Sequence, residues 1–369
     1  MTSLPAHLMD RVPAVARVRA ALTERISPTR VVEEVGPGWT EHVAAERIEC
    51  ALLATAPLPE RLSHLAAEGY TTRAGRTRLL PDVLWSPDQN LVLDDGRSRL
   101  VSPDHGRERS DLVRWTPVRR RVTDSFDGTC TSLRSARHSH VRTVVEHTGL
   151  LHTLAFATTA AEPVRLLITE PLSPAEEFFL RPMLPPHVTL QPVDVGRPVA
   201  TERYLWTTFL TRFGLAGVPT ALVRDLRERF LPPRPSTHDR IVLVSRAQAR
   251  KGRRIVDEAA LSRRLAPFGV ETIALEDLTI AEQVALFHDA RLVIAPHGAG
   301  LVNLLFAHDA DVIELFPDAQ MWPHYALISA QVGLRHQYLL GRGRHRHDDI
   351  AVDVDDLVAR VRAVLDAGD

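Results

Sequence analysis

The chain has 369 residues, of which 44% are hydrophobic and 25% are charged, and its formal net charge is -1 at pH 7. At roughly 150 residues per domain, this length predicts about two domains. The near-neutral charge gives no general attraction to nucleic acid, and the two cysteines, which lack a CxxC spacing, indicate neither a disulfide framework nor a zinc knuckle. No apolar run approaches the ~18 residues that span a bilayer, and the first residues lack the layout of a signal peptide. We therefore expect a cytoplasmic protein without a transmembrane segment or a nucleic-acid partner, with peripheral membrane association left open.

The first part of the chain, residues 1–135, is a β-containing region. Short predicted strands such as Arg30–Val32 and Leu91–Leu93 are separated by turns. The sequence Asp94–Gly96 is typical of a hairpin turn.

From residue 136 to residue 232 the pattern becomes α/β. We expect a helix near 140–158, strands at Val164–Ile168 and Val188–Val193, and a helix over 219–230 whose first turn contains a proline. Three prolines in Leu231–His238 exclude a helix or a central strand, which makes this segment the best candidate for a domain boundary.

Residues 237–349 have the most regular pattern, in which apolar strands alternate with helices. The capping-box sequence Thr279–Glu282 predicts the start of one of these helices. This alternation predicts a parallel sheet that is covered on both faces, with ligands bound at the carboxyl ends of its strands. The strands are expected at 240–244, 270–274, 291–296, 312–316 and 336–340, and a last amphipathic helix is expected within 350–369.

A glycine-rich turn follows one of these strands. His297, Gly298, Ala299 and Gly300 lie between an apolar strand and the predicted first turn of a helix, which continues through Asn303. Backbone N–H groups and the helix dipole at such a corner favour an anion, most often a phosphate, and the glycines let the backbone approach it closely.

Two further polar residues are expected at the same edge of the sheet. Arg246 follows the strand at 240–244 and could pair with a phosphate, while Glu314 lies within an apolar strand and needs hydrogen-bonding partners, which ribose hydroxyls would supply. Each residue alone is compatible with an ordinary structural role. Their arrival at one edge favours a nucleotide or nucleotide-sugar site. The DxD spacing of Asp309 and Asp311 lies in a turn, where acidic residues are common, so we expect no metal site there.

With these residues in view, the second half of the chain resembles glycosyltransferase family 61. The resemblance covers about Ile241 to Gly341. Its motifs are Ser245–Arg246, Arg254–Glu258, Ala281–Phe287, Pro296–Asn303 and Val312–Pro317.

The resemblance implies a GT-B-like α/β fold, in which two Rossmann-like domains with parallel sheets face each other across a cleft. Residues 136–232, together with the β-containing region 1–135, would form the acceptor half, and residues 237–349 would bind the nucleotide sugar. The implied reaction is inverting and metal-independent, without a cofactor, and transfers a sugar from a nucleotide donor, usually UDP, to a glycan or polysaccharide. Bacterial relatives are commonly linked to capsule or other surface polysaccharides. The implied donor-binding residues are Arg246, Arg254, His297, Gly298, Ala299, Gly300, Asn303 and Glu314.

The chain departs from the family pattern at the acceptor side. Family members carry an Asn-Tyr-x-His-Trp-type stretch followed by an acidic residue. Here His140 matches the histidine, Val141 stands at the tryptophan position, and the nearest acid, Glu146, comes two residues late. His140 and Glu146 are therefore candidate catalytic residues, and a third, unidentified base stays open. The alternative is a catalytically inactive nucleotide- or glycan-binding protein on the same scaffold.

Overall fold

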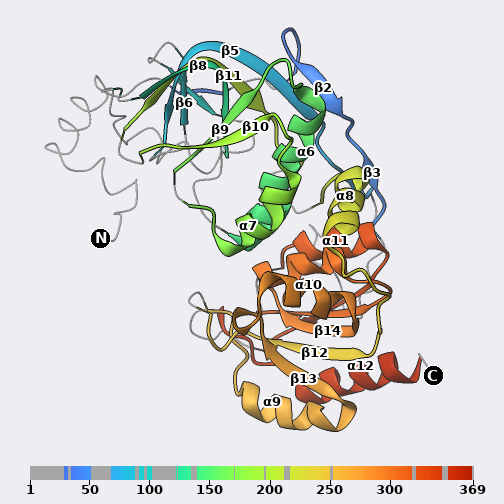
Figure 1. Cartoon of the computed structure of the whole chain (residues 1–369). Helices are drawn as coiled ribbons and strands as arrows, with labels where there is room; N and C mark the ends of the chain where they lie inside the picture. The colour runs from blue at the N-terminus through green and yellow to red at the C-terminus, as the bar shows by residue number, and fades with distance from the viewer. Residues whose placement is uncertain are drawn as a thin grey trace, which may run out of the picture.

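The protein forms two α/β units stacked one above the other, as the computed structural model shows (Figure 1). The N-terminal unit ends with α8 and the C-terminal unit begins with β12. The structure describes residues 29–31, 35–50, 68–87, 91–94, 98–101, 122, 124–133, 139–169, 171–194, 197–211, 217–249, 252–317, 321–342 and 348–367. None of the helices in these ranges is both long and apolar enough to cross a membrane.

In the described residues, the N-terminal unit is built on a nine-stranded mixed sheet with the order β1-β7-β6-β5-β11-β8-β9-β10, and β2 also pairs with β5. Strands β11, β8, β9 and β10 are parallel neighbours, whereas β5 pairs with β11, β6 and β2 in antiparallel fashion. The strands of the sheet are β1 (Thr29–Val31), β2 (Thr40–Val43), β5 (Gly75–Ser86), β6 (Leu91–Asp94), β7 (Ser98–Val101), β8 (Asp124–Ser132), β9 (Val164–Ile168), β10 (Val188–Pro192) and β11 (Val199–Thr207). A small separate pair is formed by β3 (Arg47–Ile48) and β4 (Tyr70–Thr71).

This sheet differs from the expected Rossmann-like domain over 136–232. The long strand β5 pairs with β11 along most of its length, so the boundary expected at 135/136 runs through one sheet. The pairing joins segments more than 100 residues apart in the chain, and no local pattern reports it. The expected hairpin is confirmed in its strands, because β6 and β7 pair antiparallel, while residues 95–97 of its turn lie outside the described residues.

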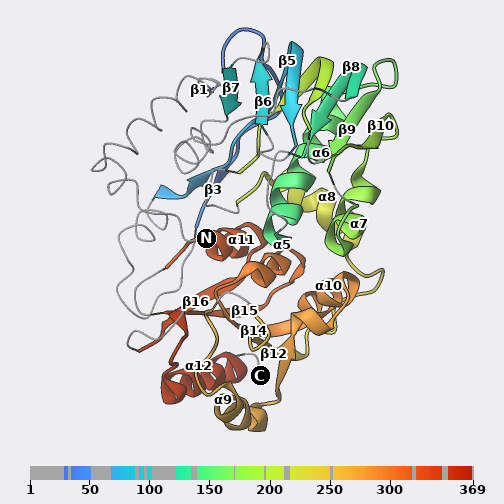
Figure 2. The same cartoon turned by 90° about the vertical axis from the view of Figure 1, so that its left-hand side faces the viewer.

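The helices of this unit lie between its sheet and the C-terminal unit (Figures 1 and 2). The helix expected near 140–158 is present as α5 (His140–Arg142), a π-helical turn (Thr143–His147) and α6 (Thr148–Ala157) in direct succession. A capping box formed by Ser173 and Glu176 starts α7, a helix that was not expected although its start carries the Ser-x-x-Glu pattern in the sequence. Within the described part of this unit, α7 (Pro174–Leu180) is followed by the short 3-10 helix Arg181–Met183 and later by α8 (Thr220–Phe230).

The C-terminal unit confirms the predicted parallel sheet. Its strands are β12 (Arg240–Ser245), β13 (Val270–Ala274), β14 (Ala290–Pro296), β15 (Asp311–Phe316) and β16 (Arg335–Leu340). The helices are α9 (Glu258–Leu265), α10 (Ile280–His288), α11 (His324–Val332) and α12 (Val354–Asp366), with 3-10 helices η3 (Ala266–Phe268), η4 (Leu275–Asp277) and η5 (Ala299–Phe306). The expected capping box is confirmed, since Thr279 and Glu282 exchange hydrogen bonds at the start of α10.

Both faces of this sheet are buried. Alternate residues of one strand point to opposite sides, so Leu243 packs in the core beneath α9 and α12, while Val242 and Val244 pack in the core beneath α10, α11 and η5. The helix expected within 350–369 is α12, and it covers this sheet as part of the C-terminal unit.

The strand order of the parallel sheet locates a crevice at one edge of the sheet. The order is β13-β12-β14-β15-β16, so the chain leaves β12 towards β13 on one side and returns to β14 on the other. At such a reversal the two loops after the neighbouring strands diverge and leave a crevice beyond their carboxyl ends. The loops after β12 and β14 are the ones that carry Arg246 and His297.

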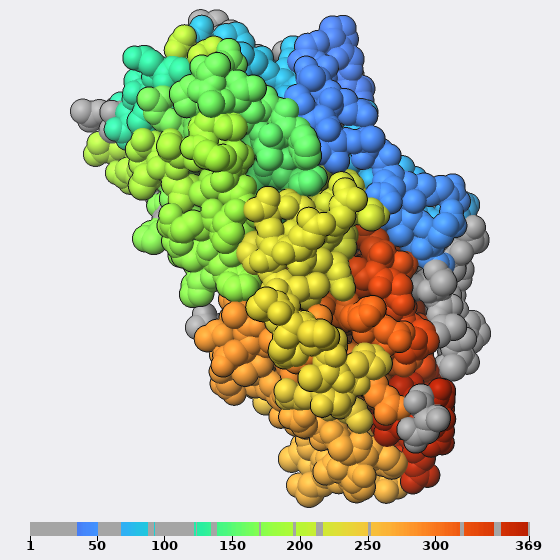
Figure 3. Space-filling model, turned by 45° about the vertical axis from the view of Figure 1, so that its right-hand side comes forward, coloured from blue at the N-terminus to red at the C-terminus, as the bar shows by residue number. Residues whose placement is uncertain are grey.

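A continuous apolar core joins the two units. It includes Val144 and Leu226 from the N-terminal unit and Val284 and Leu305 from the C-terminal unit. Arg227 adds two hydrogen bonds across the junction, from Nη1 to the carbonyls of Leu305 and Ala307, each at 2.7 Å. The yellow segment with α8 and the proline-containing linker lies across the junction in Figure 3. Because the shared core is apolar and fully buried, the two units hold a fixed relative position.

Candidate active site

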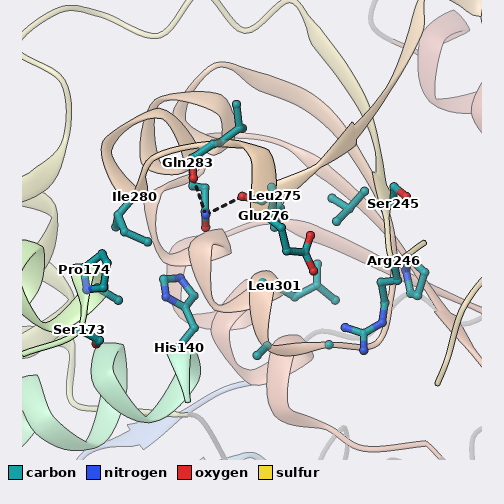
Figure 4. Close-up of a pocket in the computed structure, with 17 residues that line it drawn as sticks. His140, Ser173, Pro174, Ser245, Arg246, Leu275, Glu276, Ile280, Gln283 and Leu301 are labelled. Carbon is teal, nitrogen blue, oxygen red and sulfur yellow. Dashed lines mark hydrogen bonds between the residues drawn. The ribbon is translucent and has the colours of Figure 1, made fainter. Parts of the chain in front are cut away.

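A cavity of about 460 Å³ lies at the strand-order reversal of the parallel sheet, between the two units. The N-terminal unit contributes His140 and the start of α7, and the C-terminal unit contributes the loops after β12, β13 and β14 (Figure 4). The lining residues are His140, Ser173, Pro174, Ala175, Val244, Ser245, Arg246, Leu275, Glu276, Leu278, Ile280, Gln283, Pro296, Gly298, Ala299, Gly300 and Leu301.

Arg246 supplies the positive charge of this cavity. It follows β12 directly, as expected, and its Nη2 donates to the carbonyl of Gly252 at 3.4 Å. Its Nε is buried and has no hydrogen-bond partner among the described residues. Burial and the nearby Arg253 lower the pKa of the guanidinium, although an arginine remains cationic at neutral pH. A half-buried cation with an unsatisfied buried donor is a suitable site for an anion.

The glycine turn after β14 leaves room for this arginine. A Cβ at Gly298 would overlap Nη1 of Arg246, and a Cβ at Gly300 would overlap Cδ1 of Leu275. The backbone of Gly298 is extended, so close approach rather than backbone strain requires glycine there. The helix expected after the turn is the 3-10 helix η5. The turn brings the backbone of Gly298 beside the guanidinium, while Ala299 and Gly300 line the same cavity, which is an arrangement that suits an anion.

Behind the turn, Glu314 is completely buried and bridges two histidines. Its Oε1 lies 2.6 Å from Nδ1 of His297 and its Oε2 lies 3.0 Å from Nε2 of His336, whose Nδ1 lies 2.7 Å from the hydroxyl of Ser329. Neither Glu314 nor His297 lines the cavity. The expectation that Glu314 contacts the ribose therefore needs correction, because both of its oxygens are already engaged beneath the turn. This arrangement instead orients His297 at the base of the glycine turn.

Burial shifts the titration of this network in opposite directions. It raises the pKa of Glu314, with His336 opposing the rise, and it lowers the pKa of His297 to about 3, with help from Arg253 and Arg246. A neutral His297 can donate from Nδ1 to Glu314 throughout the neutral range.

Replacing Glu314 with alanine is expected to reduce the free energy of unfolding by about 3 kcal/mol or more, because two buried histidine N–H groups would lose their acceptor. Urea unfolding measures this change. The matched control is Glu271→Ala, since Glu271 is an exposed carboxylate that pairs with Arg240, and its loss should cost less than about 1 kcal/mol. Equal losses in the two variants would contradict a structural role for the Glu314 network.

A second hydrogen-bond chain links the two units at the cavity. Gln283 donates from Nε2 to the carbonyls of Leu275 (2.9 Å) and Leu278 (3.3 Å), and its Oε1 accepts from Nδ2 of Asn303 at 3.1 Å. The Oδ1 of Asn303 then faces Nε2 of His140 at 3.1 Å. Because an amide oxygen only accepts, His140 carries its proton on Nε2, and the lone pair of the neutral ring is on Nδ1.

His140 is suited to take a proton. It is the first residue of α5, and α5 leads directly into the π-helical turn Thr143–His147. Such π-helical turns are frequent at functional sites. Burial lowers its pKa, and the bond to Asn303 only partly opposes this shift. The ring is therefore neutral at physiological pH.

The other predicted residues are placed differently. Glu146 lies in the π-helical turn and does not line the cavity. Arg254 also lies outside the lining, where its Nη2 donates to the carbonyl of Ala249 (2.9 Å) and its backbone N–H donates to Asp349 (2.8 Å), so it braces the loop after β12.

Two residues near the site were missed. Arg253 is close enough to affect the titration of Arg246, His297 and Glu314, and it has a left-handed backbone with φ of 56°. Glu276, directly after β13, lines the cavity. Its position at a third strand end was the signal in the sequence.

The acidic turn at Asp309 and Asp311 is held by an arginine. Arg335 pairs with Asp309 at 2.7 Å and with Asp311 at 2.9 Å. Within the described part of the chain, no group of three or more His, Cys, Asp or Glu side chains is arranged to hold a metal ion.

Known sequences resemble this chain over limited stretches. Three relatives are proteins named protein O-linked-mannose beta-1,4-N-acetylglucosaminyltransferase 2, from Mus musculus, Xenopus tropicalis and Homo sapiens. They are 34%, 36% and 39% identical over 123, 118 and 95 residues, which cover 31%, 30% and 25% of this chain and 21%, 20% and 16% of the relatives. The matches thus span about a fifth of the length of these curated relatives.

The family comparison covers more of the chain. The pattern of glycosyltransferase 61 matches residues 98–313, which include both walls of the cavity and account for more than half of the sequence. The chain therefore belongs to glycosyltransferase family 61.

Proposed function

We propose that the protein is an inverting, metal-independent glycosyltransferase that moves a sugar from a nucleotide donor to a glycan acceptor. The observation that carries this proposal is the cavity at the junction, where His140 of one unit lies across from Arg246 and the glycine turn of the other. A single displacement at a sugar carbon needs a base on one side and a cationic cradle for the leaving group on the other.

The leaving group of such a donor is a nucleoside diphosphate. Arg246 supplies a half-buried positive charge with an unsatisfied Nε; the backbone of Gly298 lies beside it, and Ala299 and Gly300 line the same cavity. These groups would stabilise the negative charge that develops as the bond to the sugar breaks. The buried Glu314 would act indirectly, by orienting His297 beneath the turn.

The base in this proposal is His140. Its neutral ring has the lone pair on Nδ1, as the chain through Asn303 and Gln283 assigns, and it belongs to the unit opposite the donor cradle. An acceptor hydroxyl held between the units would lose its proton to Nδ1 as it attacks the sugar. This assignment does not require the acid that is absent from the family position, so the departure at Val141 is compatible with activity.

The names of the relatives are the basis on which we propose a donor and an acceptor. These names indicate N-acetylglucosamine as the transferred sugar and an O-linked mannose as the acceptor, so UDP-N-acetylglucosamine is the first donor to test. These animal relatives give no support to the capsule setting expected from the sequence, and the acceptor is therefore proposed only as a glycan. A cytoplasmic location stays a prediction.

A screen of nucleotide sugars for acceptor-dependent nucleotide release tests this function directly. We expect release of UDP that requires a glycan or mannoside acceptor, together with UDP binding by calorimetry. Tight UDP binding without turnover on any donor and acceptor pair would instead favour the inactive binding protein. The absence of binding by any nucleotide would contradict a phosphate site at Arg246 and the glycine turn.

A further inference from the structure

We propose that Glu276 binds the 2′- and 3′-hydroxyls of the donor's ribose, so that the site selects ribonucleotide sugars over 2′-deoxyribonucleotide sugars. This inference rests on the proposed function and deepens it by naming the class of donor. It also reassigns the role that the sequence analysis gave to Glu314.

The position of Glu276 follows from the topology of the parallel sheet. Glu276 lies in η4, directly after β13, and β13 is the immediate neighbour of β12. Arg246 follows β12, so the two residues lie just beyond the ends of adjacent strands at the same edge and line the same cavity. In doubly wound nucleotide-binding folds, an acid downstream of the first strand receives the ribose hydroxyls. Glu276 is downstream of β12, the first strand of this sheet, although the glycine turn of this chain follows the later strand β14.

Glu276 is the one carboxylate among the described residues that line the cavity. No described residue donates a hydrogen bond to it, whereas the neighbouring Asp277 accepts two bonds from Nε2 of Gln248, at 3.0 and 3.1 Å. Figure 4 shows the side chain of Glu276 extending into the cavity between Leu275 and Arg246. Both of its oxygens are therefore available to a ligand, in contrast to those of Glu314.

The chemistry of the cavity selects what this carboxylate would bind. A carboxylate repels phosphate oxygens and accepts hydrogen bonds from hydroxyls, and a vicinal diol offers two of them to one carboxylate. Arg246 and Glu276 line the same cavity and attract each other electrostatically. The cavity therefore offers a site for an anion at Arg246 and, beside it, a site for a hydrogen-bond donor at Glu276. A ribose 5′-diphosphate has this same order of groups.

A role for Glu276 as the base that activates the acceptor is less consistent with its position. Glu276 belongs to the C-terminal unit and lies on the same side as Arg246, whereas His140 is contributed by the opposite unit (Figure 4). The base must contact the acceptor, which approaches the sugar from the side opposite the leaving group. The location of Glu276 therefore favours a contact with the nucleotide.

Calorimetric titration of the full chain with UDP and with 2′-deoxy-UDP tests this inference. The wild type is expected to bind UDP on the order of tenfold to a hundredfold more tightly than 2′-deoxy-UDP, since a hydrogen bond to a charged group is lost with the 2′-hydroxyl. In Glu276→Ala the ratio of the two Kd values should fall close to one, mainly through weaker UDP binding. Asp277→Ala, the matched control at the next residue, should keep the wild-type ratio.

The outcomes separate this inference from the proposed function. The same Kd ratio in the wild type and in Glu276→Ala would overturn the ribose contact, while UDP binding itself would leave the nucleotide site intact. Loss of turnover in Glu276→Ala with an unchanged ratio would also overturn it, because it would place Glu276 at the acceptor. Failure of the wild type to bind either nucleotide would contradict the proposed function and, with it, the ribose contact.

Discussion

Replacing Arg246 with alanine is expected to lower kcat/KM for sugar transfer on the order of a hundredfold to a thousandfold, as the loss of a preorganised group that stabilises developing charge does in other enzymes. The guanidinium is half-buried beside Gly298, and its buried Nε has no partner among the described residues, so we expect its positive charge to act on a bound anion. UDP binding should weaken as well, because the ground-state diphosphate also carries negative charge. Steady-state kinetics and calorimetry measure the two effects.

The control for Arg246 is Arg263→Ala, in which the removed residue is an exposed arginine of α9 that does not line the cavity. Its removal changes the net charge equally and should leave kcat/KM and the Kd for UDP near the wild-type values. A lysine at position 246 would restore the charge without the planar fork of donors, and we expect only partial recovery. Wild-type activity in Arg246→Ala would exclude Arg246 from the phosphate site.

Replacing His140 with glutamine is expected to lower kcat by about 10²- to 10⁴-fold, the usual contribution of a general base, with little change in UDP binding. The glutamine amide can still donate to Oδ1 of Asn303, as Nε2 of His140 does, but it has no nitrogen lone pair to accept a proton. The bond between the units is then kept while the base is removed. His140→Ala, which removes both, should lose at least as much activity.

Full turnover in His140→Gln together with loss of turnover in His140→Ala would show that His140 acts only through its bond to Asn303. The dependence of kcat/KM on pH gives an independent test. Burial lowers the pKa of His140 from its ordinary value of 6.5, so the ring stays neutral, and active as a base, well into the mildly acidic range. Activity should therefore persist at pH 6.5 and fall only as the pH drops through the lowered pKa. A fall that begins above pH 6.5 would indicate a different base.

The regular elements of the C-terminal unit could be predicted because their determinants are local. Runs such as Arg240–Ser245 and Ala290–Pro296 are almost wholly apolar, and the capping box at Thr279 marks a helix start within four residues. Strands of a parallel sheet end at one edge, so Arg246 and the turn at His297 could be placed together from sequence order alone. The structure confirms that prediction.

The N-terminal sheet could not be predicted in the same way. Its longest strand in the described residues, Gly75–Ser86, contains Pro81, a left-handed Asp82 and the half-buried Arg76 and Arg78, which weaken any local strand pattern. Its pairing with Val199–Thr207 depends on the registry of two distant segments. Pairing over such distances is decided by the packing of the whole unit. The expected boundary at 135/136 is therefore absent from the sheet, in which strands from both sides of that boundary pair with each other.

The sequence by itself determined the family, the parallel sheet of the C-terminal unit and the common edge that Arg246 shares with the glycine turn, because these depend on short motifs whose neighbours in the chain are also their neighbours in space. Only the tertiary structure decided which polar residues face the cavity. His140 and Asn303 are 163 residues apart and meet through the packing of the two units, and Glu314 and Glu276, both acids near strand ends, are distinguished by burial alone. Burial and contact across a junction are properties of the assembled core, and a linear pattern does not carry them.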